Sequence, residues 1–175
     1  ELTDTPVNAY APNAKRKWRE YKLGNMGILN DIARQNGMAL DKIRSSYEFR
    51  SEILDYFGQQ ARQFGCDPDF NAYTMRKNPT PNSKSNLRTC AGHVHLGSPE
   101  LSKLSFEEKC NFIQVCDHVI GRWCVTTDPD LTRMSRYGQA GAFRPKPYGV
   151  EYRVPSNFWL TSEDHMNTMF DLCVQ

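Results

Sequence analysis

The segment Tyr148–Ser156, YGVEYRVPS, alternates between side-chain types in the way that is typical of a β-strand. Successive side chains of a strand point to opposite faces, so Glu151 and Arg153 must share one face. A carboxylate beside a guanidinium has two interpretations. The two groups neutralise each other and are structural, or they face a cation and a phosphate and form the wall of an active site.

The composition is that of one globular domain. A chain of 175 residues can bury a substantial core, and we expect a single domain over residues 1–175. The net charge of +2 is small, so no nucleic-acid partner is indicated. No stretch approaches the roughly 20 apolar residues of a membrane span. None of the six cysteines forms a C-x-x-C pair, which favours reduced thiols in a cytoplasmic protein without a membrane partner.

Periodicity and turn residues predict an α+β fold. Ser105 and Glu108 form a capping-box pattern, which opens a helix that we expect to end near residue 125. Helices and strands do not alternate regularly, which favours a curved antiparallel sheet with helices packed on one face. The expected helices span about residues 13–35, 51–64, 105–125 and 162–175, and the expected strands about 38–45, 88–97 and 149–156.

The motif GHVHLG contains two of the four histidines of the chain, His93 and His95. On a strand their imidazoles project from the same face. A neutral imidazole is a common metal ligand, and an imidazolium can contact phosphate. The alternative is a pair of exposed or core histidines without a chemical role.

Two aspartates, Asp67 and Asp69, lie two residues apart in GCDPDFNA. Carboxylates at the boundary of an element could provide oxygen ligands for Mg²⁺ or Mn²⁺. The alternative is an ordinary Asp-Pro turn.

Basic residues crowd the 21-residue stretch RMSRYGQAGAFRPKPYGVEYR, in which Glu151 is the only acid. Such an excess favours an anionic ligand, because the planar fork of arginine suits phosphate and carboxylate oxygens. The alternative is pairing with acids elsewhere. Together with the histidines and aspartates, this stretch supplies what Mg-nucleotide chemistry requires. The basic residues are Arg133, Arg136, Arg144, Lys146 and Arg153.

These motifs resemble those of a known family. EYRVP resembles the E-x-R-x-P strand of glutamine synthetase, and GHVH resembles its G-x-H-x-H strand. The stretches GCDPDFNA, NLRTCAGHVHLG and YGQAGAFRPKPYGVEYRVPSNFWL resemble the phage-encoded amidoligases (COOH·NH₂ ligase type 2) of the glutamine synthetase and glutamate–cysteine ligase superfamily. The likeness runs from Glu1 to the C-terminus.

The resemblance implies a fold like the glutamine synthetase catalytic domain and an ATP- and Mg²⁺- (or Mn²⁺-) dependent ligase. A small-molecule or peptide carboxylate would attack the γ-phosphate of ATP, and an amine would resolve the acyl phosphate to an amide. The implied location is the cytoplasm, that of the host if the chain is phage-encoded.

The resemblance also implies roles for individual residues. Glu151 and His93 would hold the cation, with a further acid from Asp67 or Asp69. His95, Arg153 and Lys146 would contact the nucleotide phosphates. Arg144 and Arg136 would face the transferred phosphoryl group or the substrate carboxylate.

Two departures from the family pattern stand out. Glutamine synthetase has an arginine where this chain has Gly149, for which Arg144 or Lys146 could compensate. The family also has an earlier strand with paired acids, of which Glu1 would be one, so we expect the chain to lack the N-terminal strands.

Two other functions remain open: a Zn or Mn hydrolase built on the His-x-His strand, and a non-catalytic phage-associated binding protein that retains the fold.

Overall fold

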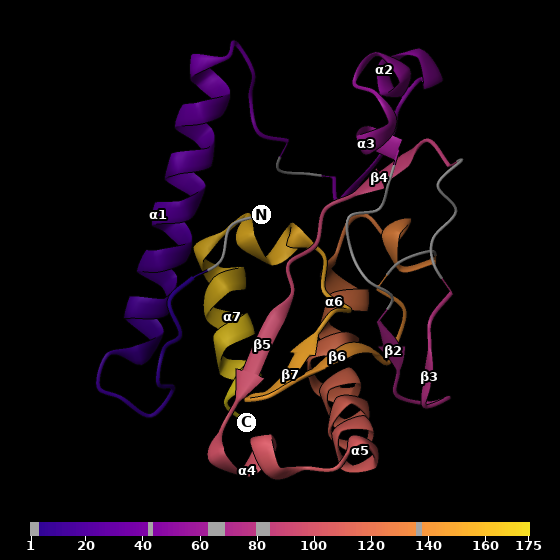
Figure 1. The fold of residues 1–175 in the computed structure, drawn as a ribbon. Helices are drawn as coiled ribbons and strands as arrows, with labels where there is room; N and C mark the ends of the chain where they lie inside the picture. Colours follow the sequence, from indigo (N-terminus) through magenta and orange to yellow (C-terminus); the bar gives the residue numbers. More distant parts are fainter. Residues whose placement is uncertain (1–3, 42–43, 63–68, 80–84, 136–137) are drawn as a thin grey trace. The chain divides into compact units, whose positions relative to one another are not determined.

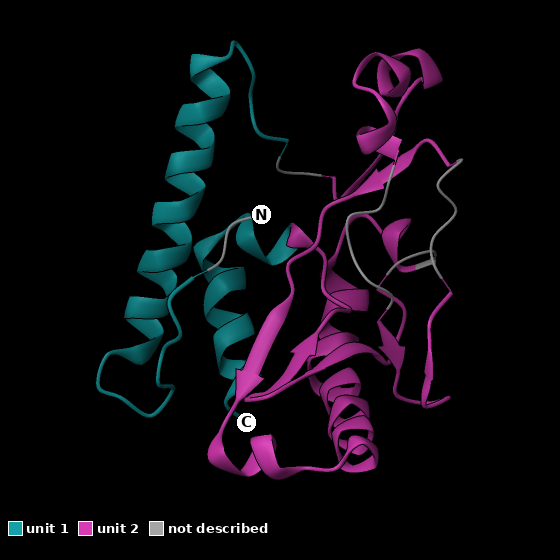
Figure 2. Cartoon of the chain, viewed as in Figure 1, with its two compact units in different colours: residues 1–43, 158–175 teal, residues 44–157 magenta. Residues whose placement is uncertain are grey.

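A computed structural model describes residues 4–41, 44–62, 69–79, 85–135 and 138–175 (Figure 1). The chain forms two compact units, residues 1–43 with 158–175 and residues 44–157 (Figure 2). The expectation of a single domain stays a prediction. No helix among the described residues is long and apolar enough to cross a bilayer.

The first unit is helical. It contains α1 (Ala14–Gln35), most of the 3₁₀-helix Asn157–Leu160, and α7 (Glu163–Cys173). The predicted helix over 13–35 is confirmed to within one residue. Trp18 of α1 stacks on Trp159, with ring centroids 5.3 Å apart, and lies 5.7 Å from the ring of Phe170 in α7. These aromatic contacts join the first and last segments of the chain into one unit.

The second unit contains a five-stranded sheet whose pairings are all antiparallel, as the α+β prediction requires. The strand order is β3-β2-β6-β7-β5. The strands are β2 (Phe70–Asn71), β3 (Arg76–Lys77), β5 (Val94–Gly97), β6 (Ala142–Lys146) and β7 (Gly149–Tyr152).

One face of this sheet is apolar and is covered by helix. The buried rings of Phe143 and Tyr152 lie opposite each other on β6 and β7. Phe106, at the start of α5 (Phe106–Cys116), packs against the rings of Phe143 and Phe70 at centroid distances of 5.9 and 5.1 Å. The helix begins at the predicted capping box, because the Ser105 hydroxyl accepts a hydrogen bond from the Glu108 amide and the Glu108 carboxylate accepts one from the Ser105 amide.

The predicted helix to about residue 125 is confirmed, with one irregularity. A π-helical stretch, Asp117–Gly121, separates α5 from α6 (Arg122–Thr127). The carboxylate of Asp117 accepts a hydrogen bond of 2.6 Å from the hydroxyl of the buried Tyr152. Burial raises the pKa of Asp117, although this hydrogen bond opposes the shift. The contact therefore ties β7 to the helix behind it.

We expect Tyr152→Phe to lower the free energy of unfolding by about 1–3 kcal/mol, because it leaves an acceptor of Asp117 without its phenol donor. Urea titration of both proteins measures the difference. Tyr10→Phe is the matched control, since the Tyr10 side chain is 91% exposed. Equal midpoints for wild type and Tyr152→Phe would show that the hydrogen bond contributes nothing.

Four of the sequence-based boundaries are wrong. The strand expected over 149–156 ends at Tyr152, the last residue of β7. Residues 88–97 form two strands in different sheets, because β4 (Leu87–Thr89) pairs with β1 (Ser46–Glu48) in a two-stranded sheet. The short strand expected at 38–45 lies later, as β1. The helix expected over 51–64 is broken at Gly58, whose φ of +83° separates α2 (Ser51–Tyr56) from α3 (Gln59–Arg62).

The remaining described elements are short. They comprise α4 (Pro99–Lys103) after β5 and the 3₁₀-helix Arg133–Ser135. The cysteines that the structure describes are reduced, as expected: Cys90, Cys110, Cys116, Cys124 and Cys173.

Candidate active site

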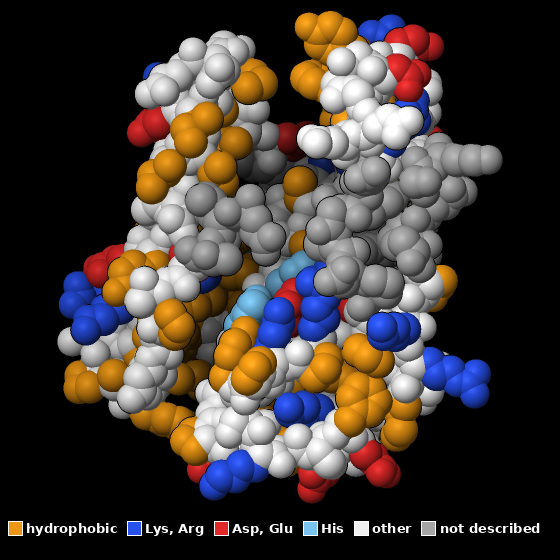
Figure 3. Space-filling model, in the orientation of Figure 1, with side chains coloured by type: hydrophobic (Ala, Val, Ile, Leu, Met, Phe, Trp, Pro, Cys, Tyr) orange, Lys and Arg blue, Asp and Glu red, His pale blue; other side chains and the backbone are white. Residues whose placement is uncertain are grey.

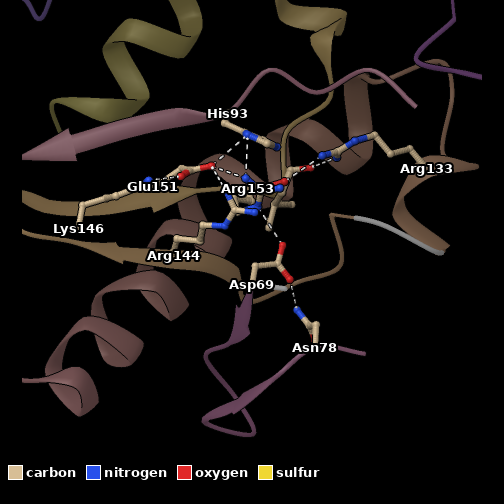
Figure 4. A network of polar contacts seen from close by, with 9 residues as sticks. Asp69, Asn78, His93, Arg133, Arg144, Lys146, Glu151 and Arg153 are labelled. Carbon is tan, nitrogen blue, oxygen red and sulfur yellow. Dashed lines mark hydrogen bonds and ion pairs between the residues drawn. The ribbon is translucent and has the colours of Figure 1, made fainter. Parts of the chain in front are cut away.

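The face of the sheet opposite α5 carries a cluster of charged side chains around Glu151 (Figure 4). The Glu151 side chain is buried, with 4% of its surface exposed. Its Oε2 lies 2.9 Å from Lys146 Nζ, and its Oε1 lies 3.8 Å from Arg144 Nη1. Oε1 also accepts a hydrogen bond from Arg153 Nη1 and lies 3.2 Å from His93 Nδ1. One carboxylate thus has three cationic partners and an imidazole.

Strand register brings these groups together. Glu151 on β7 lies directly opposite Arg144 on β6 and opposite His95 on β5. Directly opposed residues of an antiparallel pair share a face, so the three side chains form a row across three strands. Lys146 lies opposite Gly149, one step along the same hairpin. The predicted alternation of β7 therefore places Glu151 on this face.

Arg153 lies at the centre of the cluster with 1% of its surface exposed. Its Nε donates a hydrogen bond of 2.9 Å to Asp69 Oδ2, and its Nη1 lies 3.2 Å from His93 Nδ1. Asp69 is held in turn by Asn78, whose side-chain amide donates to Oδ1 at 2.8 Å. The guanidinium is therefore fixed from both ends by carboxylates and is itself a rigid part of the site.

A second buried arginine supports the backbone beside it. Arg133 is fully buried, and its two terminal nitrogens donate hydrogen bonds to the carbonyls of Val154, at 2.6 Å, and Arg153, at 3.0 Å. These bonds fix the chain that leaves β7, and they bring a further positive charge close to His93.

The charges of the cluster set the protonation states of two groups. Burial alone would raise the pKa of Glu151, but hydrogen bonds from His93 and Lys146 and the charge of Arg153 outweigh it and hold the pKa well below its ordinary value. Burial lowers the pKa of His93, as do the charges of Arg153 and Arg133, although the hydrogen bond to Glu151 opposes them. Glu151 is therefore ionised and His93 neutral near pH 7.

Seven of these residues are called the arginine cluster: Asp69, His93, Arg133, Arg144, Lys146, Glu151 and Arg153. It carries four permanent cations and two carboxylates, so it is positive overall. Figure 3 shows Lys and Arg side chains gathered beside a carboxylate and histidine on this face of the molecule.

The comparisons with known proteins decide the family. The model of the family described as phage phiEco32-like COOH·NH₂ ligase type 2 matches residues 84–174, which is just over half of the chain. The chain belongs to this family. No curated protein and no solved structure matched it. The matched region contains every member of the arginine cluster except Asp69. Membership implies an enzyme that joins a carboxylate to an amine, and the glutamine-synthetase-like fold stays an expectation.

The structure brings most of the predicted site residues of the ligase together. Glu151, His93, Arg153, Arg144 and Lys146 lie in contact around one carboxylate, and Asp69 contacts Arg153 rather than Glu151. His95 shares the face, and its Nδ1 contacts the hydroxyl of Tyr148. The three other predicted residues, Asp67, Arg136 and Glu1, lie outside the described residues.

Sequence reasoning missed two residues that hold the site. Asn78 lies in a stretch rich in turn residues, and only the long-range contact with Asp69 reveals its role. Tyr148 begins the alternating segment YGVEYRVPS and therefore looks like the start of a strand. It belongs instead to the turn between β6 and β7.

The described residues fit a partial site for a divalent cation. Glu151 offers its carboxylate, and neutral His93, whose Nδ1 donates toward Glu151 Oε1 at 3.2 Å, offers its other ring nitrogen, Nε2. Within the described ranges, no group of three His, Cys, Asp or Glu side chains could hold a metal ion by itself. Mg²⁺ usually takes one or two carboxylates and completes its shell with water and substrate phosphates, so the pair suits Mg²⁺ bound together with a nucleotide. A zinc hydrolase, which ordinarily needs three protein ligands, is less well supported.

The structure also explains why Gly149 cannot be the arginine of glutamine synthetase. Its φ is +151°, and a Cβ there would overlap the carbonyl oxygen of Leu96 on the neighbouring strand. Positive charge reaches Glu151 from β6 instead, through Lys146 and Arg144. The compensation expected from the sequence is therefore consistent with the geometry.

We expect Gly149→Ala to lower the free energy of unfolding by about 2–4 kcal/mol, because it adds backbone strain to a steric overlap. Thermal and urea unfolding measure the loss. Gly24→Ala on α1 is the matched control, since a Cβ there meets nothing within 4 Å. That helical substitution should be neutral or stabilising by up to about 1 kcal/mol. A fully stable Gly149→Ala protein would mean that the hairpin is built differently.

Proposed function

We propose that the ligase activates its carboxylate substrate with ATP. A carboxylate oxygen attacks the γ-phosphorus, the bond to the bridging oxygen breaks, and ADP leaves with the electron pair. The amine nitrogen then attacks the acyl carbon of the acyl phosphate, phosphate leaves, and the nitrogen loses a proton. The observation that carries the proposal is the arginine cluster, in which four cations surround only two carboxylates.

The excess of positive charge suits this reaction. Attack of a carboxylate on a phosphate brings two anions together, and fixed cations remove that repulsion in the transition state without reorganisation. Arg153 is positioned for this purpose, because Asp69 and Glu151 hold it in place. It would contact phosphate oxygens while remaining part of the site wall.

Lys146 and Arg144 have a different role in the proposal. Their side chains are 29% and 22% exposed, so both reach the surface of the site. Lys146 would bind nucleotide phosphate, and Arg144 would bind the transferred phosphoryl group or the substrate carboxylate. When an anion enters, these two cations can exchange part of their interaction with Glu151 for the ligand.

Glu151 and His93 would hold Mg²⁺ or Mn²⁺, with Asp67, Asp69 and Glu1 as the further acids proposed from the family resemblance. When it is bound, the divalent cation neutralises negative charge on the phosphate oxygens. The neutral state of His93 suits this role, because only a neutral imidazole has a lone pair for a metal. His95 would contact phosphate oxygens of the nucleotide, and Arg136 would face the transferred phosphoryl group or the substrate carboxylate.

Trapping the intermediate tests the proposal. Protein, ATP and Mg²⁺ are incubated with candidate carboxylates and hydroxylamine, which converts an acyl phosphate to a hydroxamate. We expect hydroxamate and ADP to form in equal amounts and only when ATP and the carboxylate are both present. Amide formation that proceeds without ATP would contradict the mechanism.

Nucleotide binding separates the proposal from the non-catalytic alternative. A ligand that binds only the native state must stabilise it, so Mg-ATP should raise the melting temperature. No shift at millimolar Mg-ATP would favour a binding protein that retains the fold. Tightly bound zinc found by metal analysis, together with no nucleotide affinity, would favour the hydrolase.

A further inference from the structure

Tyr148, in the turn between β6 and β7, contacts one of the predicted site histidines. Its hydroxyl oxygen lies 2.5 Å from His95 Nδ1, which is a short hydrogen bond. The two rings lie nearly parallel, with planes 26° apart and centroids 6.1 Å apart. Neither the family roles nor the arginine cluster accounts for this pair.

The surrounding backbone holds the phenol in this position. Gly97 follows His95 by two residues and lies on the same face of β5. A Cβ on Gly97 would lie 3.1 Å from both Cδ2 and the carbonyl oxygen of Tyr148, so a side chain there would displace the ring or the turn by a few tenths of an ångström. The amide of Ser98 donates a hydrogen bond of 3.2 Å to the same carbonyl. The β6–β7 turn and strand β5 together therefore hold the ring of Tyr148 beside His95.

The hydrogen bond selects a tautomer of His95. A neutral imidazole has one bare nitrogen and one N–H, whereas a protonated phenol is a good donor and its oxygen is a weaker acceptor than imidazole nitrogen. At 2.5 Å from Nδ1 the phenol therefore donates, which makes Nδ1 the bare nitrogen and places the proton on Nε2. His95 then carries a hydrogen-bond donor at Nε2.

A donor at this place suits the cluster beside it. His95 lies directly across from Glu151, in the row that also contains Arg144. We propose that Tyr148 is a positioning residue that holds neutral His95 as the Nε2–H tautomer, so that the imidazole donates to an oxygen of the anionic substrate. The hydrogen bond from His95 Nε2 to the substrate rests on the proposed function, whereas the assignment of the tautomer does not.

Nitrogen NMR tests the tautomer directly. In protein labelled with ¹⁵N-histidine, the bare and protonated ring nitrogens have separate chemical shifts, and the His95 signals are assigned with His95→Ala. At a pH where His95 is neutral, we expect Nδ1 to be bare in wild type and the two tautomers to mix in Tyr148→Phe. Tyr10→Phe is the control and should leave the signals unchanged. A wild-type His95 protonated at Nδ1, or signals unaffected by Tyr148→Phe, would overturn the proposal.

Binding and kinetics test the use of the donor. Titration with inorganic tripolyphosphate should shift the Nε2 signal of wild type, and an unmoved signal would refute donation to a phosphate oxygen.

Tyr148→Phe should raise KM for ATP roughly three- to tenfold, the size of one weakened hydrogen bond, with a smaller change in kcat. In a His95→Ala background the same substitution should have no further effect. Additive effects would show that Tyr148 does not act through His95. A chain without ATP-dependent activity would refute the proposed function, while the NMR spectra would still decide the tautomer.

Discussion

Glu151→Gln is expected to lower kcat/KM for ATP-dependent amide formation at least about 100-fold. The carboxylate is the shared partner of Lys146, Arg144 and Arg153, and it is one of the two described groups that would hold the cation. Glutamine keeps the shape but removes the charge, so the three cations lose their common counter-ion. Steady-state rates at varied carboxylate concentration, with saturating Mg-ATP, measure the effect, and a kcat/KM close to wild type would contradict the assigned role.

Stability measurements show whether the loss comes from chemistry or from unfolding. Glu48→Gln is the matched control, because Glu48 is an exposed residue of β1. Breaking one partner of a buried charged network costs about 3–5 kcal/mol, so Glu151→Gln should also melt at a lower temperature. Kinetics are therefore measured well below the melting transition, where circular dichroism shows that the variant is folded.

The pH dependence of this stability difference has a defined sign. The folded-state pKa of Glu151 is lowered, since its hydrogen bonds and neighbouring charges outweigh the burial that opposes them. Such a group contributes its full stabilisation above the pKa of the unfolded chain, about 4.3, and loses it as the pH falls toward the folded-state value. The difference between wild type and Glu151→Gln should therefore be constant near neutral pH and shrink in acid. A difference that grows in acid would contradict the lowered pKa.

Arg153 is expected to be as sensitive as Glu151. Its Nε and Nη1 contact Asp69, Glu151 and His93 at the same time. The single ammonium group of a lysine cannot reach all three in this geometry. We expect Arg153→Lys to lower kcat/KM about 100-fold although the charge is kept. Arg153→Met should in addition lower the free energy of unfolding by about 3–5 kcal/mol, because it removes a buried cationic partner that Asp69 and Glu151 share.

The comparison of the two substitutions separates charge from geometry. Full activity of Arg153→Lys would show that only the positive charge matters and would contradict the role of the guanidinium fork. Arg16→Lys is the matched control, since Arg16 forms an exposed pair with Glu20 one turn along α1. Such surface pairs contribute less than about 1 kcal/mol, so this control should change neither rate nor stability measurably.

Local patterns in the sequence predicted the parts of the fold that depend on local physics. The capping box at Ser105 and the helix over 13–35 are confirmed, because caps and helical periodicity are set by residues three or four apart. The strand expected over 88–97 is wrong for the opposite reason. Its alternation is continuous, but its two halves pair with strands distant in the chain, and only those long-range pairings divide it.

The site was predictable in its residue types but not in its connections. Two residues of one strand that lie two apart must share a face, and this rule placed Glu151 beside Arg153. The rule carries no information about partners from other strands. The sequence predicts Asp69 as a cation ligand, but in the structure its carboxylate accepts hydrogen bonds from Arg153 and Asn78. The first interpretation of YGVEYRVPS is therefore confirmed, since Glu151 and Arg153 form an ion pair. The second, that they face a cation and a phosphate, stays a prediction.

The alternation of β7 limits how the length of this chain can change during evolution. Insertion of one residue between Gly149 and Glu151, or deletion of Val150, would turn Tyr152 toward the charged cluster and Glu151 toward the apolar layer under α5. A change of two residues would restore the facing. Homologous chains should therefore vary in length at the Pro147–Tyr148 turn or in steps of two, and single-residue indels within the strand should be absent from active members.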